Sequence, residues 1–233
     1  MSFYEEPRVS HLADGISLVI PTDGRASRRL LFPVLMAALD RQQFPQLQVV
    51  VVGPSEAEGF YRGFGVEYVA APFETANGLL GAKMHRGVQE ARHNLVLMAH
   101  DDVVLADDFW ECLAGSAADW HFAAPGYLFA EGEFRGVPLS HRSVQYPVWT
   151  LGGPKGHRWL ADGEAWDEWS YVSGESLLGW REPMLDVGWD ASNDHRVTRG
   201  TKGAFDVQFG HRANALGYRT RYFPSIREWC LEL

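Results

Sequence analysis

Short apolar segments alternate with helix-like segments over the first hundred residues, and this alternation limits the possible folds more than any other feature. Residues 16–20, 47–52, 66–70 and 94–99 have the length and apolar character of buried strands. Between them, residues 27–43 and 79–91 repeat apolar side chains at helical spacing. Strands separated by helices of this length form right-handed crossovers and a parallel sheet. The first half of the chain is therefore predicted to be an α/β sheet.

The second half differs in composition and in the periodicity of its apolar residues. From residue 126 to residue 188, glycine, proline and aromatic residues are frequent and no clean period persists. Residues 205–216 regain helical spacing, and Gly217 after them is a typical helix stop. No repeat or linker divides the chain. We expect a single α/β domain over residues 1–233, with a mostly parallel central sheet, flanking helices and a loop-rich, aromatic-rich C-terminal half.

Composition excludes several classes of protein. Hydrophobic residues make up 46% of the chain, which is too many for a disordered protein. The formal net charge of −9 argues against a protein that coats nucleic acid, because such binding relies on basic residues. Cys112 and Cys230 form no CxxC pair, so neither a disulfide scaffold nor a cysteine zinc site is expected. The N-terminal residues do not resemble a secretory signal, and no apolar run is long enough to span a membrane. We expect a cytoplasmic protein, with peripheral membrane attachment left open.

Two adjacent aspartates, Asp101 and Asp102, directly follow the strand predicted at 94–99. In open parallel sheets, ligands bind outside the carboxyl ends of the strands. Neighbouring carboxylates between apolar flanks repel each other and are costly to desolvate. A divalent cation such as Mg²⁺ or Mn²⁺ offsets both costs, since it prefers carboxylate and phosphate oxygens. The simpler alternative is that the pair caps a helix or forms a solvated turn.

Four segments, taken in order along the chain, resemble one known family. They are residues 16–25 (ISLVIPTDGR), residues 83–88 with 91–109, residues 172–190 (VSGESLLGWREPMLDVGWD) and residues 205–218 (FDVQFGHRANALGY). These are similar to the first strand and turn, the DxD-type metal motif, the acceptor-side segment and the catalytic helix of family 2 glycosyltransferases. Those enzymes invert the anomeric centre and have a GT-A fold, which the resemblance implies for this chain.

The resemblance also implies a donor site. Asp102 matches the last carboxylate of the metal motif and would bind Mg²⁺ or Mn²⁺, which acts as a Lewis acid on the leaving diphosphate. His100 stands where the family has the first acidic residue. In the family, an acidic residue after the second strand contacts the base, whereas Gly53 occupies that place here, so the donor nucleotide is left open. The implied donor-binding residues are Pro21, Thr22, Asp23, Lys83, Asp101, Arg196, Arg199 and Lys202. The last three lie in a polar segment, residues 191–203, that is either a closing lid or an ordinary solvated loop.

On the acceptor side, Asp206 matches the family's catalytic aspartate and would act as the general base. Phe205 stands before it where the family usually has glutamate. The alternative role for Asp206 is that of an acidic residue stabilised at a helix N-terminus. The implied acceptor-binding residues are Gly174, Glu175, Trp180 and Trp189. Tryptophan offers an apolar face to sugar C–H groups, although such residues also serve as core anchors.

The sequence thus predicts a metal-dependent glycosyltransferase that uses a nucleotide-diphosphate sugar. About residues 1–110 would bind the donor and about residues 111–233 would face the acceptor. The acceptor (a saccharide, a lipid-linked sugar, a metabolite or a protein) and the oligomeric state are not determined by the sequence. Two alternatives remain: a catalytically inactive module that binds a nucleotide sugar or a partner protein on the same fold, and, more distantly, a sugar-nucleotide nucleotidyltransferase.

Overall fold

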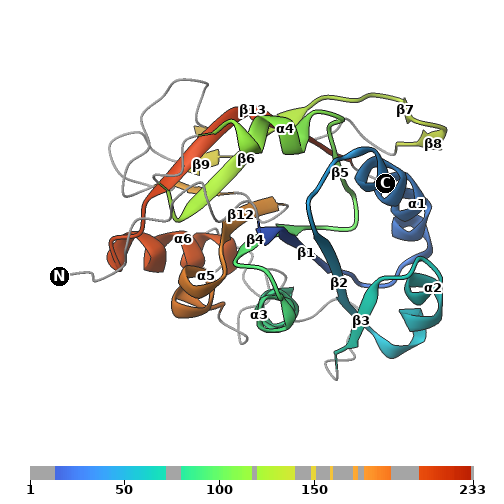
Figure 1. Ribbon diagram of the computed structural model, residues 1–233, viewed down its shortest axis with the longest axis horizontal. Helices are drawn as coiled ribbons and strands as arrows, with labels where there is room; N and C mark the ends of the chain where they lie inside the picture. The colour runs from blue at the N-terminus through green and yellow to red at the C-terminus, as the bar shows by residue number, and fades with distance from the viewer. Residues whose placement is uncertain are drawn as a thin grey trace.

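A curled sheet of eight strands forms the centre of the structure, with helices on both faces (Figure 1). The computed structural model describes residues 14–71, 80–116, 120–139, 148–150, 158–159, 170–172, 176–189 and 205–231. The strands of the central sheet are β1 (Ile16–Pro21), β2 (Leu47–Gly53), β3 (Glu67–Ala70), β4 (Leu95–Ala99), β5 (Val103–Leu105), β6 (Phe122–Leu128), β12 (Ser176–Trp180) and β13 (Thr220–Cys230). Their order across the sheet is β3-β2-β1-β4-β12-β6-β13-β5.

Most of these strands run in one direction. β1 pairs in parallel with β2 and β4, and β2 pairs in parallel with β3. β12 lies antiparallel between β4 and β6, while β13 is parallel to β6 and antiparallel to β5. Strands from both halves of the chain therefore belong to one sheet, and the carboxyl ends of β1, β2 and β4 lie along one edge.

Six α-helices and one short 3₁₀-helix are described. They are α1 (Ala26–Arg41), η2 (Ser55–Ala57), α2 (Glu58–Arg62), α3 (Leu80–Glu90), α4 (Phe109–Ala114), α5 (Arg181–Val187) and α6 (Phe205–Ala215). Within the ranges described, no helix is long and apolar enough to cross a membrane. Two smaller sheets complete the described structure: β7 (Glu133–Phe134) with β8 (Val137–Pro138), and β9 (Val148–Thr150) between β10 (Arg158–Trp159) and β11 (Ser170–Val172).

Alternate residues of the central strands supply two separate cores. Leu18 of β1 packs in a cluster with Phe32 of α1 and with residues of α2 and α4. Val19, the next residue, packs on the other face with Val88 of α3 and with residues of α5 and α6. Burying each such side chain contributes about 1.5–3 kcal/mol. This two-sided burial explains why the strands read as continuous apolar runs in the sequence.

One close contact fixes α3 against the sheet. A Cβ atom on Gly87 would lie 2.2 Å from Cγ1 of Val19, so only glycine allows α3 to lie this near to β1. The position of α3 matters because this helix carries Lys83 toward the end of β1.

The sequence predictions for the sheet are confirmed. The four predicted strands correspond to β1, β2, β3 and β4, and the three predicted helices correspond to α1, α3 and α6, each within about two residues. The mixed architecture, with a mostly parallel sheet and flanking helices, is also the one expected.

Candidate active site

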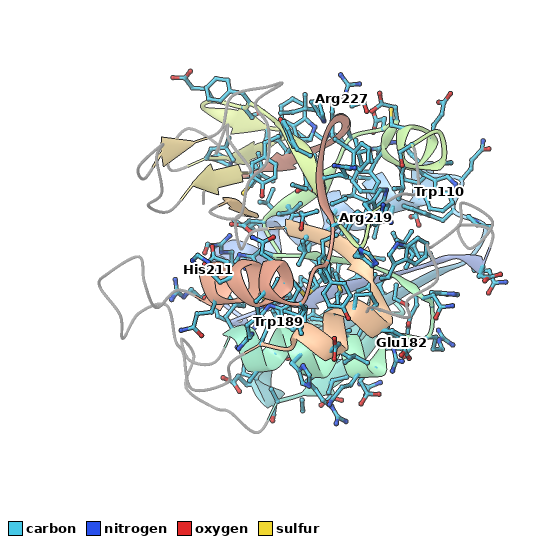
Figure 2. The ribbon with its side chains drawn as sticks, turned by 90° about the vertical axis from the view of Figure 1, so that its left-hand side faces the viewer. Trp110, Glu182, Trp189, His211, Arg219 and Arg227 are labelled. Atoms are coloured by element: carbon cyan, nitrogen blue, oxygen red, sulfur yellow. The ribbon has the colours of Figure 1, made fainter. Side chains whose placement is uncertain are left out.

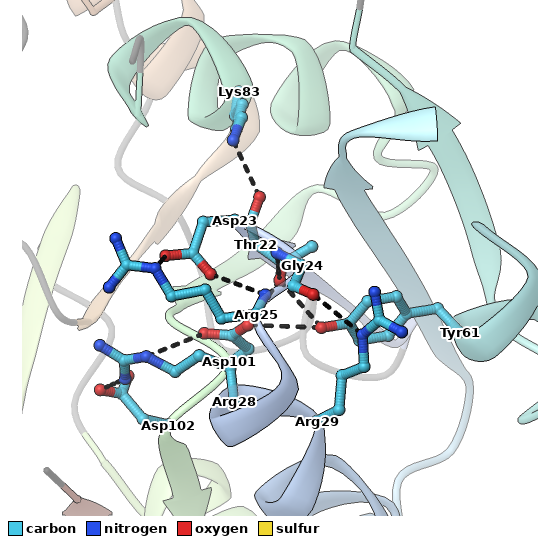
Figure 3. A network of polar contacts seen from close by, with 10 residues as sticks. All are labelled: Thr22, Asp23, Gly24, Arg25, Arg28, Arg29, Tyr61, Lys83, Asp101 and Asp102. Atoms are coloured by element: carbon cyan, nitrogen blue, oxygen red, sulfur yellow. Dashed lines mark hydrogen bonds and ion pairs between the residues drawn. The ribbon is translucent and has the colours of Figure 1, made fainter. Parts of the chain in front are cut away.

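The predicted donor-site residues that the structure describes meet where β1 and β4 end. Thr22 and Asp23 follow β1 directly, and Asp101 and Asp102 follow β4 after one intervening residue. β1 and β4 are parallel neighbours, so these residues lie side by side although they are far apart in the sequence (Figure 3). Lys83 reaches the same place from α3.

The hydroxyl of Thr22 is the centre of this cluster. It donates a hydrogen bond to Oδ2 of Asp101 over 2.5 Å and accepts one from the backbone N–H of Gly24 over 2.9 Å. The hydroxyl of Tyr61, on α2, lies 2.8 Å from Oγ1 of Thr22. Since threonine has one proton to donate, the Tyr61 hydroxyl is the donor in that contact. The loop after β1 is thereby tied to the end of β4 and to α2.

Asp101 is held in a dry environment. It is 4% exposed, and burial raises the pKa of its carboxyl above the ordinary value, while the Thr22 hydrogen bond opposes that rise. Burial, with the Asp101 charge as a smaller contribution, also raises the pKa of Tyr61, which stays a neutral hydrogen-bond donor. A solvated turn, one of the alternatives for the aspartate pair, is therefore excluded.

Asp102 is equally buried, at 5% exposed, and its Oδ2 atom is in direct contact with the guanidinium of Arg28. Arg28 lies in the first turn of α1, and its Nε is 3.9 Å from Oδ1 of Asp101. The other carboxylate oxygen of Asp102, Oδ1, is buried and accepts no hydrogen bond within the described part of the chain. Sequence reasoning did not find Arg28 or Tyr61.

The sequence around Arg28 did carry a signal. Arg25, Arg28 and Arg29 stand at the start of α1, and its first turn contains no acidic residue. Cations are disfavoured at a helix N-terminus by the helix dipole. In the structure Arg25 pairs with Asp23 over 2.9 Å, and Arg29 donates to the carbonyl of Gly24. Basic residues that are kept at a helix N-terminus despite this unfavourable interaction are typical of an anion-binding site.

Lys83 brings a further positive charge to the cluster. Its Nζ donates to the carbonyl of Thr22 over 2.8 Å, and the residue is 4% exposed. Burial lowers the pKa of Lys83, whereas the nearby carboxylates of Asp23, Asp101 and Glu56 act in the opposite direction. A lysine ammonium at this edge of the sheet is a typical partner for a phosphate oxygen.

The end of β2 explains one departure from the family pattern. A Cβ atom on Gly53 would lie 2.5 Å from Cγ2 of Thr22 and 2.7 Å from the hydroxyl of Tyr68. There is therefore no room for an acidic side chain at this position. Glu56, in η2, is the acidic residue of this region that lies within electrostatic range of Lys83.

Asp206, the predicted base, lies half-buried in the first turn of α6. α6 leads into β13, whose first residue, Thr220, pairs with Phe122 at the start of the parallel strand β6. α6 ends near the beginnings of these strands, so its first turn lies toward their carboxyl ends (Figure 2). This is the edge of the sheet that carries the two adjacent aspartates.

The two described tryptophans of the acceptor set lie in different places. Trp189 lies beside α6, with its ring stacked on Phe209 at a centroid distance of 4.6 Å (Figure 2). Trp180 pairs with Leu95 at the beginning of β4, the opposite end from Asp101. Its indole nitrogen donates to the carbonyl of Trp120, so it is anchored in the core. Gly174, Glu175, Arg196, Arg199 and Lys202 lie outside the described residues.

The described residues fit a divalent ion held by a single carboxylate. No three His, Cys, Asp or Glu side chains gather into a metal site among them. The buried Oδ1 of Asp102 is nevertheless a hard oxygen donor without a partner in that part of the chain. Mg²⁺ is commonly bound by one or two carboxylates together with substrate phosphates and water, and such a shell fits here.

Comparison with known proteins identifies the fold. No protein-family model and no curated protein sequence matches the chain. Among solved structures, it is similar to the mannosyltransferase PcManGT from Pyrobaculum calidifontis in complex with GDP-Man and Mn²⁺, with 14% identity and a TM-score of 0.56 over 92% of this chain and 56% of that one. It is also similar to residues 1–349 of S. aureus TarS in complex with UDP-GlcNAc, with 16% identity and a TM-score of 0.51 over 89% of this chain and 55% of that one.

A third similar structure is a CMP:2-keto-3-deoxy-manno-octonic acid synthetase complexed with CTP, with 12% identity and a TM-score of 0.50 over 90% of this chain and 89% of that one. The chain spans about half the length of the two transferases. These similarities establish a GT-A-type fold, as the resemblance in the sequence predicted.

Proposed function

We propose that the protein transfers a sugar from a nucleotide-diphosphate donor to an acceptor hydroxyl with inversion. The observation that carries this proposal is the polar cluster of Thr22, Arg28, Lys83, Asp101 and Asp102 at the carboxyl ends of β1 and β4. Two neighbours with this fold are in complex with a nucleotide sugar, GDP-Man in one and UDP-GlcNAc in the other. Ligands of open α/β sheets bind at this edge.

The donor's diphosphate would contact Lys83 and the arginines at the start of α1. Asp102 would hold Mg²⁺ or Mn²⁺, as the Mn²⁺ in the PcManGT complex suggests. When bound, the ion supplies Lewis-acid stabilisation to the leaving diphosphate. Asp101 is buried and, through Thr22, fixes the loop that follows β1. Arg196, Arg199 and Lys202 are proposed to contact the diphosphate from the segment before α6.

Asp206 is proposed as the general base on the acceptor hydroxyl. Removing that proton as the hydroxyl attacks makes it a competent nucleophile. Gly174, Glu175 and Trp189 are proposed to lie on the acceptor side, with the first two just before β12. β12 itself begins beside Ala99, at the end of β4.

The test is a product assay with the protein and a panel of nucleotide sugars, with and without Mn²⁺. The proposal predicts Mn²⁺-dependent release of the nucleoside diphosphate, with water as the acceptor where no sugar acceptor is supplied. Asp206→Asn should reduce this turnover and leave donor binding in place. The control is Asp40→Asn, an exposed carboxylate at the far end of α1, which should retain full turnover.

The alternatives give different products. A nucleotidyltransferase, for which the synthetase complexed with CTP is a structural precedent, would transfer the nucleotidyl group of a nucleoside triphosphate to a sugar or sugar phosphate and release pyrophosphate. An inactive module would bind nucleotide sugars without turnover in any variant. Full turnover by Asp206→Asn would contradict the base assignment.

A further inference from the structure

The carboxylate proposed to hold the metal is already paired with a cation of the protein. The Arg28 guanidinium touches Oδ2 of Asp102 and lies 3.9 Å from Asp101. The side chain of Arg28 is 27% exposed, whereas the side chains of Asp101 and Asp102 are only 6% and 7% exposed. The guanidinium is therefore the more exposed partner in these contacts, and Figure 3 shows it beside both carboxylates.

A metal ion bound to Asp102 would disturb the Arg28–Asp102 ion pair. A divalent ion bound to either oxygen of Asp102 would lie within a few ångströms of the guanidinium, and two cations at that separation repel each other. Arg28 lies in the first turn of α1 and its side chain is partly exposed, so its long stem can swing the head group toward solvent only by breaking the contact with Asp102. An incoming phosphate would then be the nearest anion for it, and arginine binds phosphate oxygens in a bidentate manner.

We infer that Arg28 is the resident counter-ion of Asp102 and exchanges places with the divalent ion when the diphosphate enters. In this exchange Asp102 passes from the guanidinium to the metal, and Arg28 passes from the carboxylate to the phosphate. A divalent ion and the diphosphate of a nucleotide sugar carry equal and opposite formal charges. Their joint entry thus leaves the charge balance of the site unchanged, whereas either one alone disturbs it.

Binding of the two ligands is therefore coupled through one side chain. Metal alone must either bind beside the guanidinium, against its repulsion, or displace Arg28 from Asp102. Pyrophosphate alone must draw Arg28 away and leave a buried carboxylate uncompensated, which is costly. Together they satisfy every charge, and such coupling is reciprocal by thermodynamic linkage. The inference rests on the proposed function only for the identity of the anion.

The exchange is tested with Mn²⁺ alone, titrated into the full chain and followed by the electron paramagnetic resonance signal of the free ion. Arg28→Gln removes the competing charge and should bind Mn²⁺ about tenfold more tightly than the wild type, a typical size for such coupling. Arg28→Lys keeps the charge and should bind as weakly as the wild type. Calorimetry with inorganic pyrophosphate and no metal should give the opposite order, with Arg28→Gln binding more weakly than the wild type.

Arg25→Gln is the matched control, because it removes the same charge from the same helix end at a residue that pairs with Asp23. An equal gain in Mn²⁺ affinity for Arg25→Gln and Arg28→Gln would overturn the inference, since the effect would then be general electrostatics. So would an unchanged or reduced affinity in Arg28→Gln. The gain should disappear in Arg28→Gln/Asp102→Asn, and its persistence there would place the ion elsewhere. The proposed glycosyl transfer is tested separately. If the Mn²⁺ titrations give the expected order but no nucleotide sugar is consumed, the proposed function is wrong and the exchange at Arg28 stands.

Discussion

Replacing Thr22 by valine removes the one hydroxyl that joins the ends of β1 and β4 to α2. The wild-type hydroxyl contacts Asp101 at 2.5 Å, Tyr61 at 2.8 Å and the N–H of Gly24 at 2.9 Å, and Thr22 is 2% exposed. Each buried partner left without a hydrogen bond costs about 1–3 kcal/mol. Two of the three are partly compensated in the variant. Tyr61 already lies 3.4 Å from Oδ2 of Asp101, and the Gly24 N–H is only partly buried.

The main loss is therefore the charge-assisted bond to Asp101. We expect Thr22→Val to lower the free energy of unfolding by about 2–3 kcal/mol, the usual contribution of a hydrogen bond to a buried charged group. Thr22→Ser keeps the hydroxyl and removes only a methyl group, so it should lose no more than about 1 kcal/mol. Urea unfolding of the three proteins measures both differences. A Thr22→Val variant as stable as Thr22→Ser would refute the reasoning.

The same variant has a pH signature. The Thr22 bond opposes the raised pKa of Asp101, so removing it raises that pKa further in the folded state. When a carboxyl has a higher pKa in the folded protein than in the unfolded chain, the free energy of unfolding falls as the pH rises through the folded pKa. The deficit of Thr22→Val relative to the wild type should thus be largest at high pH, where Asp101 is ionised in both proteins. It should shrink as the pH falls and Asp101 becomes protonated in both proteins. A deficit independent of pH would mean that the lost bond does not involve a charged carboxylate.

Two changes in α3, with a control substitution in α2, test how α3 positions the site. Gly87→Ala should lower the free energy of unfolding by about 1–2 kcal/mol, because its Cβ meets Val19 and the overpacking outweighs the gain in helix propensity. Gly59→Ala, with nothing within 4 Å of its Cβ, should be neutral or stabilising by up to about 1 kcal/mol in the same urea experiment. Lys83→Met removes a buried charge and should weaken pyrophosphate binding about tenfold by calorimetry, the loss of one charge-assisted hydrogen bond. Unchanged pyrophosphate affinity would exclude Lys83 from the anion site.

The sheet was predictable because its central strands are buried on both faces. A run such as 47–52 has only one stable placement, and the helices between the strands fix the direction of the next one. β5, β7 and β8 are two or three residues long, too short to carry a period. β13 contains Pro224 and several charged residues, and it pairs with β6 through a register shift, so its pattern is not that of a regular strand.

The site was predictable only where it is local in sequence. Thr22 and Asp101 each follow a predicted strand, and the parallel pairing of β1 and β4 brings them together. Tyr61 comes from a short helix with no distinctive pattern, and only the folded chain shows that it donates to Thr22. Arg28 lies in the first turn of α1, which contains no acidic residue, and this departure from the usual helix pattern was visible in the sequence. Its pairing with Asp102 depends on where α1 begins relative to β4, which no local pattern encodes.

The central claim is that the ends of β1 and β4 bind a nucleotide sugar together with a divalent ion. Thermal unfolding with a panel of nucleotide sugars and Mn²⁺, compared between the wild type and Asp102→Asn, tests it most directly. A ligand at about one hundred times its Kd adds about 2.7 kcal/mol. For a domain of this size that amount raises the Tm by about 5–10 °C. The account predicts such a rise for at least one nucleotide sugar in the wild type and its loss in Asp102→Asn. No rise with any nucleotide sugar, or an equal rise in both proteins, would contradict it.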